Sequence, residues 1–289
     1  MKADHPDAVP IAGGTDLMVE LNFDRRRPAR LLDVSRLSAL RNWRREDGTV
    51  FLGAGVPYSA IVRDLGAFTP LVQASRTVGS PQIRNRGTVG GNLGTGSPAG
   101  DALPVLAAYD AEVVLGKAGA TRTVPWRQFL VGPKKTAIAP DELILGARWR
   151  ITRGPGSFSK VGPRNAMVIA IASVCLVLDE ERREIRVALG SVGPTVLRAS
   201  EAETHAAGAL VNAGAWDDPQ TPLPPEALEE FARGVAAAAR PIDDVRGTSA
   251  YRRHVCGILA RRALTWALQD RRSGPGRDHP GPPRQDRAC

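Results

Sequence analysis

Two glycine-rich segments constrain this chain more than any other feature of its sequence. In residues 8–17, a short apolar stretch runs into a Gly-Gly pair, and a helix is predicted to start near Leu17. Residues 87–101 carry another Gly-Gly pair and precede a helix predicted over 102–109. Each segment is predicted to connect a strand to a helix. Because glycine has no side chain, the backbone amides of such turns can approach an anion closely. Two of them could hold the two phosphates of a dinucleotide from opposite sides.

Neither segment fits the common nucleotide-binding fingerprints. No Gly-x-Gly-x-x-Gly follows a predicted strand with an acid about twenty residues further on. No Gly-x-x-x-x-Gly-Lys-Ser/Thr loop occurs either. A Rossmann fold and a P-loop protein are therefore not expected. Two ordinary tight turns remain the alternative explanation of the glycines.

The composition is that of a globular protein, with 43% hydrophobic and 24% charged residues among 289. The net charge of +9 raises the question of nucleic-acid binding. Only 5% of the residues are aromatic, however, and no basic stripe is interleaved with aromatic side chains for base stacking. Part of the excess charge lies in 271–289, a segment rich in Gly, Pro and Arg for which we expect disorder. No nucleic-acid partner is therefore expected.

Neither a membrane segment nor a metal cluster is expected. The longest apolar run, 166–178, is shorter than the roughly eighteen residues of a membrane helix. No charged-then-apolar leader precedes the first glycine segment. The cysteines Cys175, Cys256 and Cys289 are not spaced for zinc or an iron–sulfur cluster, and an odd number does not make a disulfide framework. A reducing, cytoplasmic location is therefore expected, with Cys175 as a small core residue.

The pattern of predicted elements changes near residue 150. Before it, short strands alternate with short helices, as in an α+β domain that carries both glycine segments. After it, residues 158–189 read as long strands, one of them within 167–178, and helices follow over 226–239 and 249–268. We therefore predict an α+β chain of two domains and a tail, with boundaries at 1–152, 153–270 and 271–289.

A series of motifs runs through the chain from about residue 8 to residue 268. They are Ala12-Gly13-Gly14-Thr15-Asp16-Leu17, Gln82-Ile83-Arg84-Asn85, Thr88-Val89-Gly90-Gly91-Asn92, Ser97-Pro98-x-x-Asp101, Phe158-Ser159-Lys160 with Arg164-Asn165-Ala166, Gly190-Ser191-Val192-Gly193-Pro194-Thr195, and Pro241-Ile242-Asp243-Asp244-Val245-Arg246-Gly247 with Tyr251-Arg252. In this order they resemble the FAD-binding subunits of the molybdenum hydroxylases, which include xanthine and carbon monoxide dehydrogenases. Residues 78–87 are most similar to bacterial xanthine dehydrogenase subunits, which favours purine as the substrate of the complex.

The resemblance implies a fold, a cofactor and a set of contacts. The first domain would be a flavin domain of the vanillyl-alcohol-oxidase (PCMH) type, in which two α+β subdomains hold FAD between them. The second would combine a three-stranded sheet with helices. The glycine segments would wrap the diphosphate and the ribityl chain. The cofactor contacts implied by position are Ile11, Ala12, Gly13, Gly14, Thr15, Asp16, Leu17, Val78, Thr88, Gly90, Gly91, Asn92, Asp101, Ile144 and Lys160.

Five of these residues carry a more specific expectation. Val78 and Ile144 match positions that flank the flavin ring, although both could be plain core residues. Asp101 would accept hydrogen bonds from sugar hydroxyls, or cap the helix that follows it. Asp16 suits a helix cap better than a phosphate ligand, because like charges repel. Lys160 matches a lysine beside the isoalloxazine, where an ammonium near N1 and C2=O would stabilise negative charge and raise the ring's potential.

The resemblance further implies an electron-transfer subunit with no catalytic or metal-ligating residues of its own. It would take electrons from a [2Fe-2S] small subunit and pass them to NAD+ or another acceptor, while a molybdopterin large subunit oxidises the substrate. No Ser/His/Asp set, paired carboxylates or metal cluster occurs in the sequence, in agreement with this role. The open alternatives are a medium subunit of a carbon monoxide, aromatic or aldehyde hydroxylase, and a self-contained flavin oxidoreductase.

One departure from the family precedes the first glycine segment. The family has an additional strand and helix there, whereas this sequence starts at Met1-Lys2-Ala3-Asp4-His5-Pro6. A missing edge strand would leave backbone hydrogen bonds open beside the first segment and weaken FAD binding.

Overall fold

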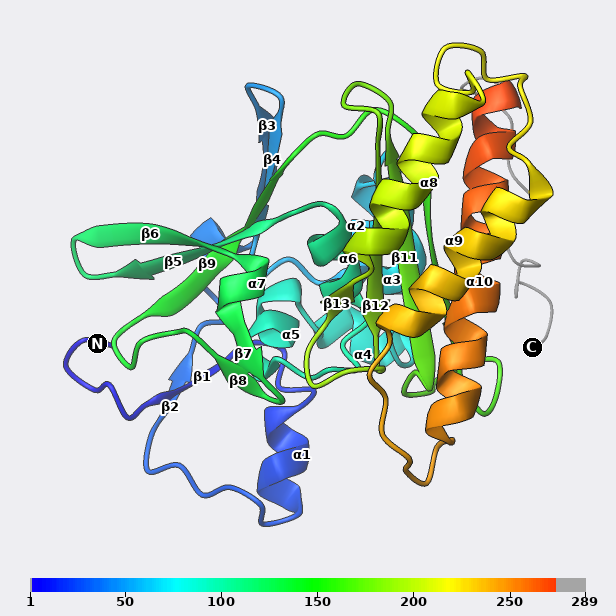
Figure 1. Ribbon diagram of the computed structural model, residues 1–289. Coiled ribbons are helices and arrows are strands. Elements are labelled where there is room, and N and C mark those ends of the chain that lie inside the picture. Colours follow the sequence, from blue (N-terminus) through cyan, green and yellow to red (C-terminus); the bar gives the residue numbers. More distant parts are fainter. Residues whose placement is uncertain (1, 274–289) are drawn as a thin grey trace.

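The first half of the chain forms short strands and helices, as its sequence pattern predicts (Figure 1). The computed structural model describes residues 2–273. The strands of this half are β1 (Val9–Ile11), β2 (Leu31–Asp33), β3 (Trp43–Glu46), β4 (Thr49–Gly53), β5 (Glu112–Lys117), β6 (Ala120–Pro125), β7 (Leu130–Gly132), β8 (Lys135–Thr136) and β9 (Leu143–Arg150). Its helices are α1 (Leu17–Asn22), α2 (Tyr58–Asp64), α3 (Thr69–Thr77), α4 (Pro81–Arg86), α5 (Val89–Thr95), α6 (Ala102–Ala108) and α7 (Trp126–Phe129), with a 3-10 turn at Ser38–Leu40.

This half contains three sheets, one of which is the short pair β7–β8. Strands β1 and β2 pair in parallel, with α1 between them in the chain, and form a separate two-stranded sheet. The antiparallel strands β3-β4-β9-β5-β6 form a five-stranded sheet. Inside, Tyr109 stacks on Trp149 with 5.4 Å between ring centroids, and Phe68 meets both rings edge-on. The sheet, α2, α3, α5 and α6 share one hydrophobic core.

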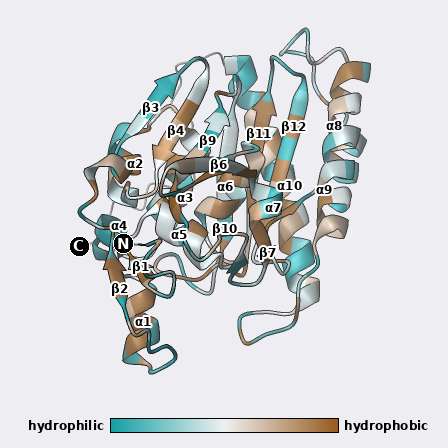
Figure 2. Cartoon of the chain, turned by 90° about the vertical axis from the view of Figure 1, so that its left-hand side faces the viewer, coloured by the Kyte–Doolittle hydropathy of each residue, from teal (hydrophilic) through white to brown (hydrophobic). Residues whose placement is uncertain are grey.

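The β1–α1–β2 unit is the least buried part of this half. Helix α1 has no buried residue, and Figure 2 shows its hydrophobic colouring on the outside of the molecule. Met18 and Val19 are each 44% exposed, and Phe23 at the end of the helix is 68% exposed. The first glycine segment therefore lies in a small unit that depends on its neighbours for support.

The second half is a four-stranded antiparallel sheet covered by three helices (Figure 1). Its elements are β10 (Gly156–Val161), β11 (Ala172–Asp179), β12 (Glu184–Gly190), β13 (Leu197–Arg198), α8 (Ser200–Asn212), α9 (Pro225–Ala238) and α10 (Ser249–Ser273). Every residue of β11 is buried, because both faces of the sheet are covered. Val174 and Leu176 pack toward the helices, whereas Cys175 and Val177 belong to the core of the first half. The prediction that Cys175 is a core residue is confirmed.

Helix α6 fills the space between the two halves. It contacts β11 and β12, and all its residues are buried because its sequence is apolar throughout. Polar contacts join the halves beside it. The Arg198 guanidinium donates to Ala107 O (3.1 Å) and to Asp110 Oδ1 (2.8 Å), and it also binds the buried carboxylate of Glu203 (2.6 Å). One face of the second sheet is therefore fixed against the first half of the chain.

The predicted fold class is confirmed, but helix α8 was not predicted, and the structure of the second half differs from the prediction in three further places. The strand expected within 167–178 begins only at Ala172, and 162–171 form no strand. A short fourth strand, β13, adds to the expected three-stranded sheet. Helix α10 continues to Ser273, so 271–273 of the predicted tail are helical, and the rest of that tail lies outside the described residues.

None of the helices between residues 2 and 273 combines the length and apolar composition that a bilayer-spanning helix needs.

Replacing Arg198 by methionine should destabilise the fold, because Glu203 would stay buried without its ionic partner. The two side chains are 13% and 9% exposed. We expect the free energy of urea unfolding to fall by about 3 kcal/mol. The control is Arg183→Met, since Arg183 and its partner Asp217 are 51% and 69% exposed, and it should cost less than about 1 kcal/mol. Equal losses in the two variants would show that the buried Arg198–Glu203 pair contributes no more to stability than the exposed pair.

Candidate functional site

The two glycine segments lie directly against each other. A Cβ atom on Gly13 would overlap the carbonyl oxygen of Arg86 and lie 3.0 Å from the backbone nitrogen of Gly87, so only glycine fits there. A side-chain bond strengthens the contact: Thr95 Oγ1, at the end of α5, donates to Asp16 Oδ2 at 2.9 Å. The fold therefore brings together two segments that are far apart in the sequence.

The first segment behaves locally as predicted, except at Asp16. Strand β1 ends at Ile11 and helix α1 begins at Leu17, with Gly14 at φ 76°, a left-handed conformation that glycine adopts without strain. Asp16 occupies the N-cap position of α1, but its side chain makes no capping hydrogen bond. The predicted cap is therefore wrong, and the Asp16 carboxylate serves the link to Thr95 instead.

The second segment is not the loop that the sequence predicted. It contains helix α5, and helix α4 rather than a strand precedes it. Thr88 caps α5, since its Oγ1 accepts from the Gly91 backbone N–H at 3.0 Å. The propensity argument failed here because glycine disfavours helices in isolation, whereas burial and the Thr88 cap support this short helix.

The two glycines of that segment differ in their surroundings. A Cβ atom on Gly90 would overlap Ala54, whose carbonyl accepts the Gly90 N–H at 2.9 Å, so Gly90 is needed for packing. A Cβ atom on Gly91 would meet only Thr88 Oγ1, at 3.3 Å, and Gly91 is exposed. Gly91 therefore presents an open stretch of backbone that a ligand can approach.

A cavity of about 380 Å³ borders both segments. Ala12 and Gly13 line it from the first segment and Thr88 from the second, and three arginines contribute to its wall: Arg36, Arg41 and Arg86. Asp33 lies there too; hydrogen bonds from Ser35 and the positive charges of Arg36 and Arg86 lower its pKa. Three guanidinium groups against one carboxylate give this cavity a positive potential that favours an anionic ligand.

Asp101 and Lys160 form a buried ion pair across the two halves. Asp101 lies directly before α6 and Lys160 on β10; each side chain is 8% exposed, and Lys160 Nζ lies 2.5 Å from Asp101 Oδ2. Lys160 Nζ also donates to Thr77 O (2.9 Å) and Val168 O (3.2 Å). Burial raises the pKa of Asp101, against the opposing effects of Lys160 and Thr77. The Asp101 side chain makes no capping bond to α6, so the helix cap, the alternative to a cofactor contact for Asp101, is excluded.

Two buried oxygens near this pair have no hydrogen-bond donor among the described residues: Asp101 Oδ1 and Asn92 Oδ1. The Asn92 side chain lies close to the backbone that precedes Asp101, because a Cβ atom on Gly100 would lie 2.5 Å from the Asn92 amide nitrogen. Buried polar atoms are nearly always satisfied in native proteins. A ligand with several hydroxyl or N–H donors would satisfy both, and the ribityl chain and flavin ring of FAD have such donors. The residues present therefore fit FAD.

The two apolar candidates lie at the edge of the first core. Val78 and Ile144 are partly buried and pack against it. Ile144 Cδ1 would lie 3.5 Å from a Cβ atom on Gly94, which places Ile144 over α5.

Sequence reasoning missed Thr77 and Thr95, which hold Asp101 and Asp16. A threonine that bonds a distant carboxylate gives no local signal in a sequence.

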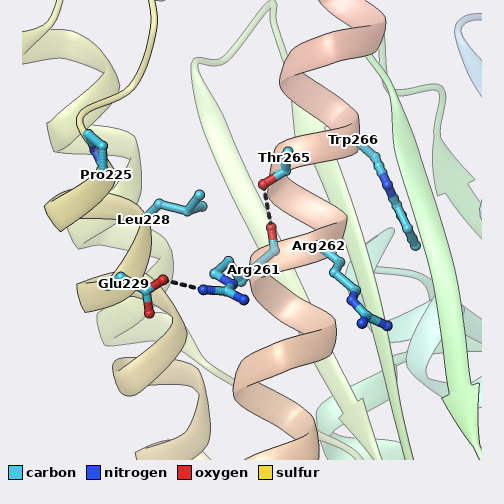
Figure 3. Close-up of a pocket in the computed structure, with 7 residues that line it drawn as sticks. All are labelled: Pro225, Leu228, Glu229, Arg261, Arg262, Thr265 and Trp266. Atoms are coloured by element: carbon cyan, nitrogen blue, oxygen red, sulfur yellow. Dashed lines mark hydrogen bonds and ion pairs between the residues drawn. The ribbon is translucent and has the colours of Figure 1, made fainter.

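A second cavity, of about 340 Å³, lies between α9 and α10. Figure 3 shows Glu229 of α9 facing Arg261 of α10 across it, with Trp266 nearby. Figure 1 places these helices on the opposite side of the molecule from β1 and α1. None of the predicted cofactor contacts lines this cavity.

Among residues 2–273, no group of three or more His, Cys, Asp or Glu side chains could hold a metal ion.

Comparison with known proteins identifies the family. A family model described as the FAD binding domain in molybdopterin dehydrogenase matches residues 1–148, and one described as the CO dehydrogenase flavoprotein C-terminal domain matches residues 157–267. The chain belongs to the FAD-binding medium subunits of the molybdenum hydroxylases. The predicted family and the predicted cofactor, FAD, are thereby confirmed.

Relatives of this medium subunit match over nearly their whole length. The glyceraldehyde dehydrogenase medium chain of Sulfolobus acidocaldarius is 32% identical over 261 residues, which cover 88% of this chain and 89% of that one. A putative xanthine dehydrogenase FAD-binding subunit of Escherichia coli is 27% identical over 277 residues, covering 92% and 90%. The structure of carbon monoxide dehydrogenase from Hydrogenophaga pseudoflava matches with a TM-score of 0.79 at 29% identity, covering 91% of this chain and 90% of that one.

Replacing Gly13 by alanine should separate the two glycine segments, because the new methyl group would overlap the backbone of Arg86. We expect the apoprotein of this variant to unfold at lower urea concentration and to be cleaved faster by protease within 8–37. Gly208→Ala is the matched control, since a Cβ atom there meets nothing within 4 Å. A Gly13→Ala protein as stable and protease-resistant as the control would contradict the contact.

Proposed function

We propose that this medium subunit carries electrons from a [2Fe-2S] small subunit to NAD+ or another acceptor. A molybdopterin large subunit would oxidise the substrate of the complex. The observation that supports the proposal is the direct contact of the two glycine segments at Gly13 and Arg86, beside a cavity with a positive wall. That contact presents the backbone of both segments to one ligand, as a dinucleotide cofactor requires.

The proposed diphosphate contacts are backbone groups of the first segment and of α5. The amides of residues 11–17 would meet phosphate oxygens, and the exposed surface at Gly91 would let the ligand approach α5 closely. Thr88 and Gly90 would hold α5 in place, and Asn92 Oδ1 would accept a hydrogen bond from a ligand hydroxyl. Arg36, Arg41 and Arg86 would add favourable charge from the adjoining cavity. We assign these contacts to a flavin domain over 1–152, followed by a C-terminal domain over 153–270.

The flavin end of the cofactor is assigned to residues at the junction of the two halves. Val78 and Ile144 would contact the ring and exclude water, and Asp101 and Lys160 would set the charge beside it. FAD supplies the redox chemistry when bound, whereas the protein supplies binding, orientation and electrostatics. We further propose a cytoplasmic location, since Cys175 and Cys256 are both free and buried thiols.

We propose xanthine or a related purine as the substrate of the complex. The motif at 78–87 supports this, together with the similarity to the putative xanthine dehydrogenase subunit. The carbon monoxide dehydrogenase medium chain of Hydrogenophaga pseudoflava is 29% identical, however, and the glyceraldehyde dehydrogenase chain 32%. An aldehyde or carbon monoxide hydroxylase is therefore the second candidate.

A self-contained flavin oxidoreductase would need a base or acid of its own beside the flavin. The ionisable groups proposed there are Asp101 and Lys160, and each is already engaged by the other. An internal ion pair of this kind is poorly suited to proton transfer with a substrate. The structure therefore offers this alternative no support.

The purified chain should bind one FAD when the cofactor is added, because its own residues form the site. Flavin absorbance after gel filtration, together with chromatography of the released cofactor, measures this directly. A chain that remains colourless with excess FAD, while its unfolding transition shows that it is folded, would contradict the proposed function.

Replacing Gly91 by leucine should weaken FAD binding by more than tenfold, because the side chain would fill the space proposed for the ligand. The unfolding of the apoprotein should change little, since only Thr88 Oγ1 lies near the new Cβ atom. Gly208→Leu is a control at another helix glycine, where a Cβ atom would meet nothing within 4 Å. Equal FAD affinity in the two variants, measured by quenching of FAD fluorescence, would remove Gly91 from the site.

A further inference from the structure

Lys160 has no proton left for a direct bond to a cofactor. A lysine ammonium has three hydrogen-bond donors and no acceptor. Asp101 Oδ2, Thr77 O and Val168 O lie at 2.5, 2.9 and 3.2 Å from Lys160 Nζ, and they account for all three. These acceptors come from three separate segments, so moving the ammonium toward a ligand would break several bonds at once.

Asp101, by contrast, has one oxygen available. Its Oδ2 accepts from Lys160 and lies 3.2 Å from Thr77 Oγ1, whereas its Oδ1 is buried and has no donor among the described residues. A buried carboxylate oxygen without a donor is costly, and a donor brought by a ligand recovers that cost. Among the two partners of the ion pair, the carboxylate is therefore the one that can bind a ligand.

The charged and titratable groups that act on Asp101 are few. Lys160 on β10 stabilises its ionised form. Burial raises the pKa of Tyr58 on α2, and the ionised Asp101 carboxylate raises it further. Thr77 at the end of α3 supplies a neutral hydroxyl. Without Lys160, no other charged residue of the described part of the chain would stabilise the ionised carboxylate, which would therefore take up a proton at higher pH.

We propose that Lys160 is a positioning residue that acts on the cofactor through Asp101. Its ammonium keeps the Asp101 carboxylate ionised and fixes the orientation of that side chain. Asp101 Oδ1 then accepts a hydrogen bond from a hydroxyl or N–H group of the cofactor. This assignment rests on the proposed function, and it replaces the expected direct contact of Lys160 with the flavin N1 and C2=O.

A double-mutant cycle on FAD affinity tests the assignment. The variants are Lys160→Met, Asp101→Asn and the two together, with FAD as the probe and fluorescence quenching as the measurement. Lys160→Met should weaken FAD binding about 10- to 100-fold in the natural background, the loss expected for a charge-assisted bond. In the Asp101→Asn background the same change should cost less than about threefold. The same loss in both backgrounds would overturn the proposal.

A pH series provides a readout that loss of packing alone would not change. In Lys160→Met the affinity for FAD should fall as the pH is lowered, beginning at a higher pH than in the natural protein, because the pKa of Asp101 is higher without its partner. Lys160→Arg, which keeps the charge, should restore the natural pH profile. Parallel pH profiles for the Met variant and the natural protein would overturn the proposal.

FAD binding by the unaltered chain distinguishes a failure of the proposed function from a failure of the proposed role of Lys160. If the unaltered chain binds FAD and the losses of the two substitutions add, only the role of Lys160 is wrong. If the unaltered, folded chain does not bind FAD, the proposed function fails and the assignment of Lys160 fails with it. Urea unfolding of each apoprotein identifies any variant that does not fold, and for such a variant Lys160→Arg against Lys160→Gln provides the comparison.

Discussion

The contact between the Gly13 backbone and the Arg86 carbonyl is the constraint on which the candidate site depends. Any side chain at Gly13 would occupy the place of that carbonyl. The contact brings a poorly buried unit, β1–α1–β2, against the end of α4, directly before helix α5, which contributes to the first hydrophobic core. The bond from Thr95 to Asp16 fixes the same two segments a second time. The lack of a side chain at Gly13 thus decides how the backbone of both segments is oriented.

The second requirement is that the two halves of the chain stay together. Asp101 precedes α6 in the first half and Lys160 lies on β10 in the second, so their ion pair forms only if the second sheet packs against α6. The apolar sequence of α6 and the fully buried strand β11 provide that packing, and Arg198 adds polar contacts beside it. The proposed flavin end of the site is therefore a product of the interface rather than of either half.

Much of the fold and part of the candidate site could be predicted from the sequence. The elements and contacts that were not predicted have physical reasons. The turn from β1 into α1 follows from local chemistry, and so do the long strands and the helices α9 and α10 of the second half, whereas helix α8 was missed. Helix α5 was missed because its glycines disfavour a helix until Thr88 and Ala54 support it. The positions of Asp101 and Lys160 came from resemblance, but no pattern indicates that Thr77 O and Val168 O complete the ammonium's bonds. Such partners depend on tertiary packing, which a local pattern does not encode.

A crystal structure of the chain with FAD bound would test the central claim most directly. The account predicts that both phosphorus atoms lie within hydrogen-bonding reach of the backbone of residues 11–17 or of Gly91, with the two glycine segments still in contact at Gly13 and Arg86. A diphosphate bound elsewhere, for example between α9 and α10, or glycine segments that part when FAD binds, would contradict it.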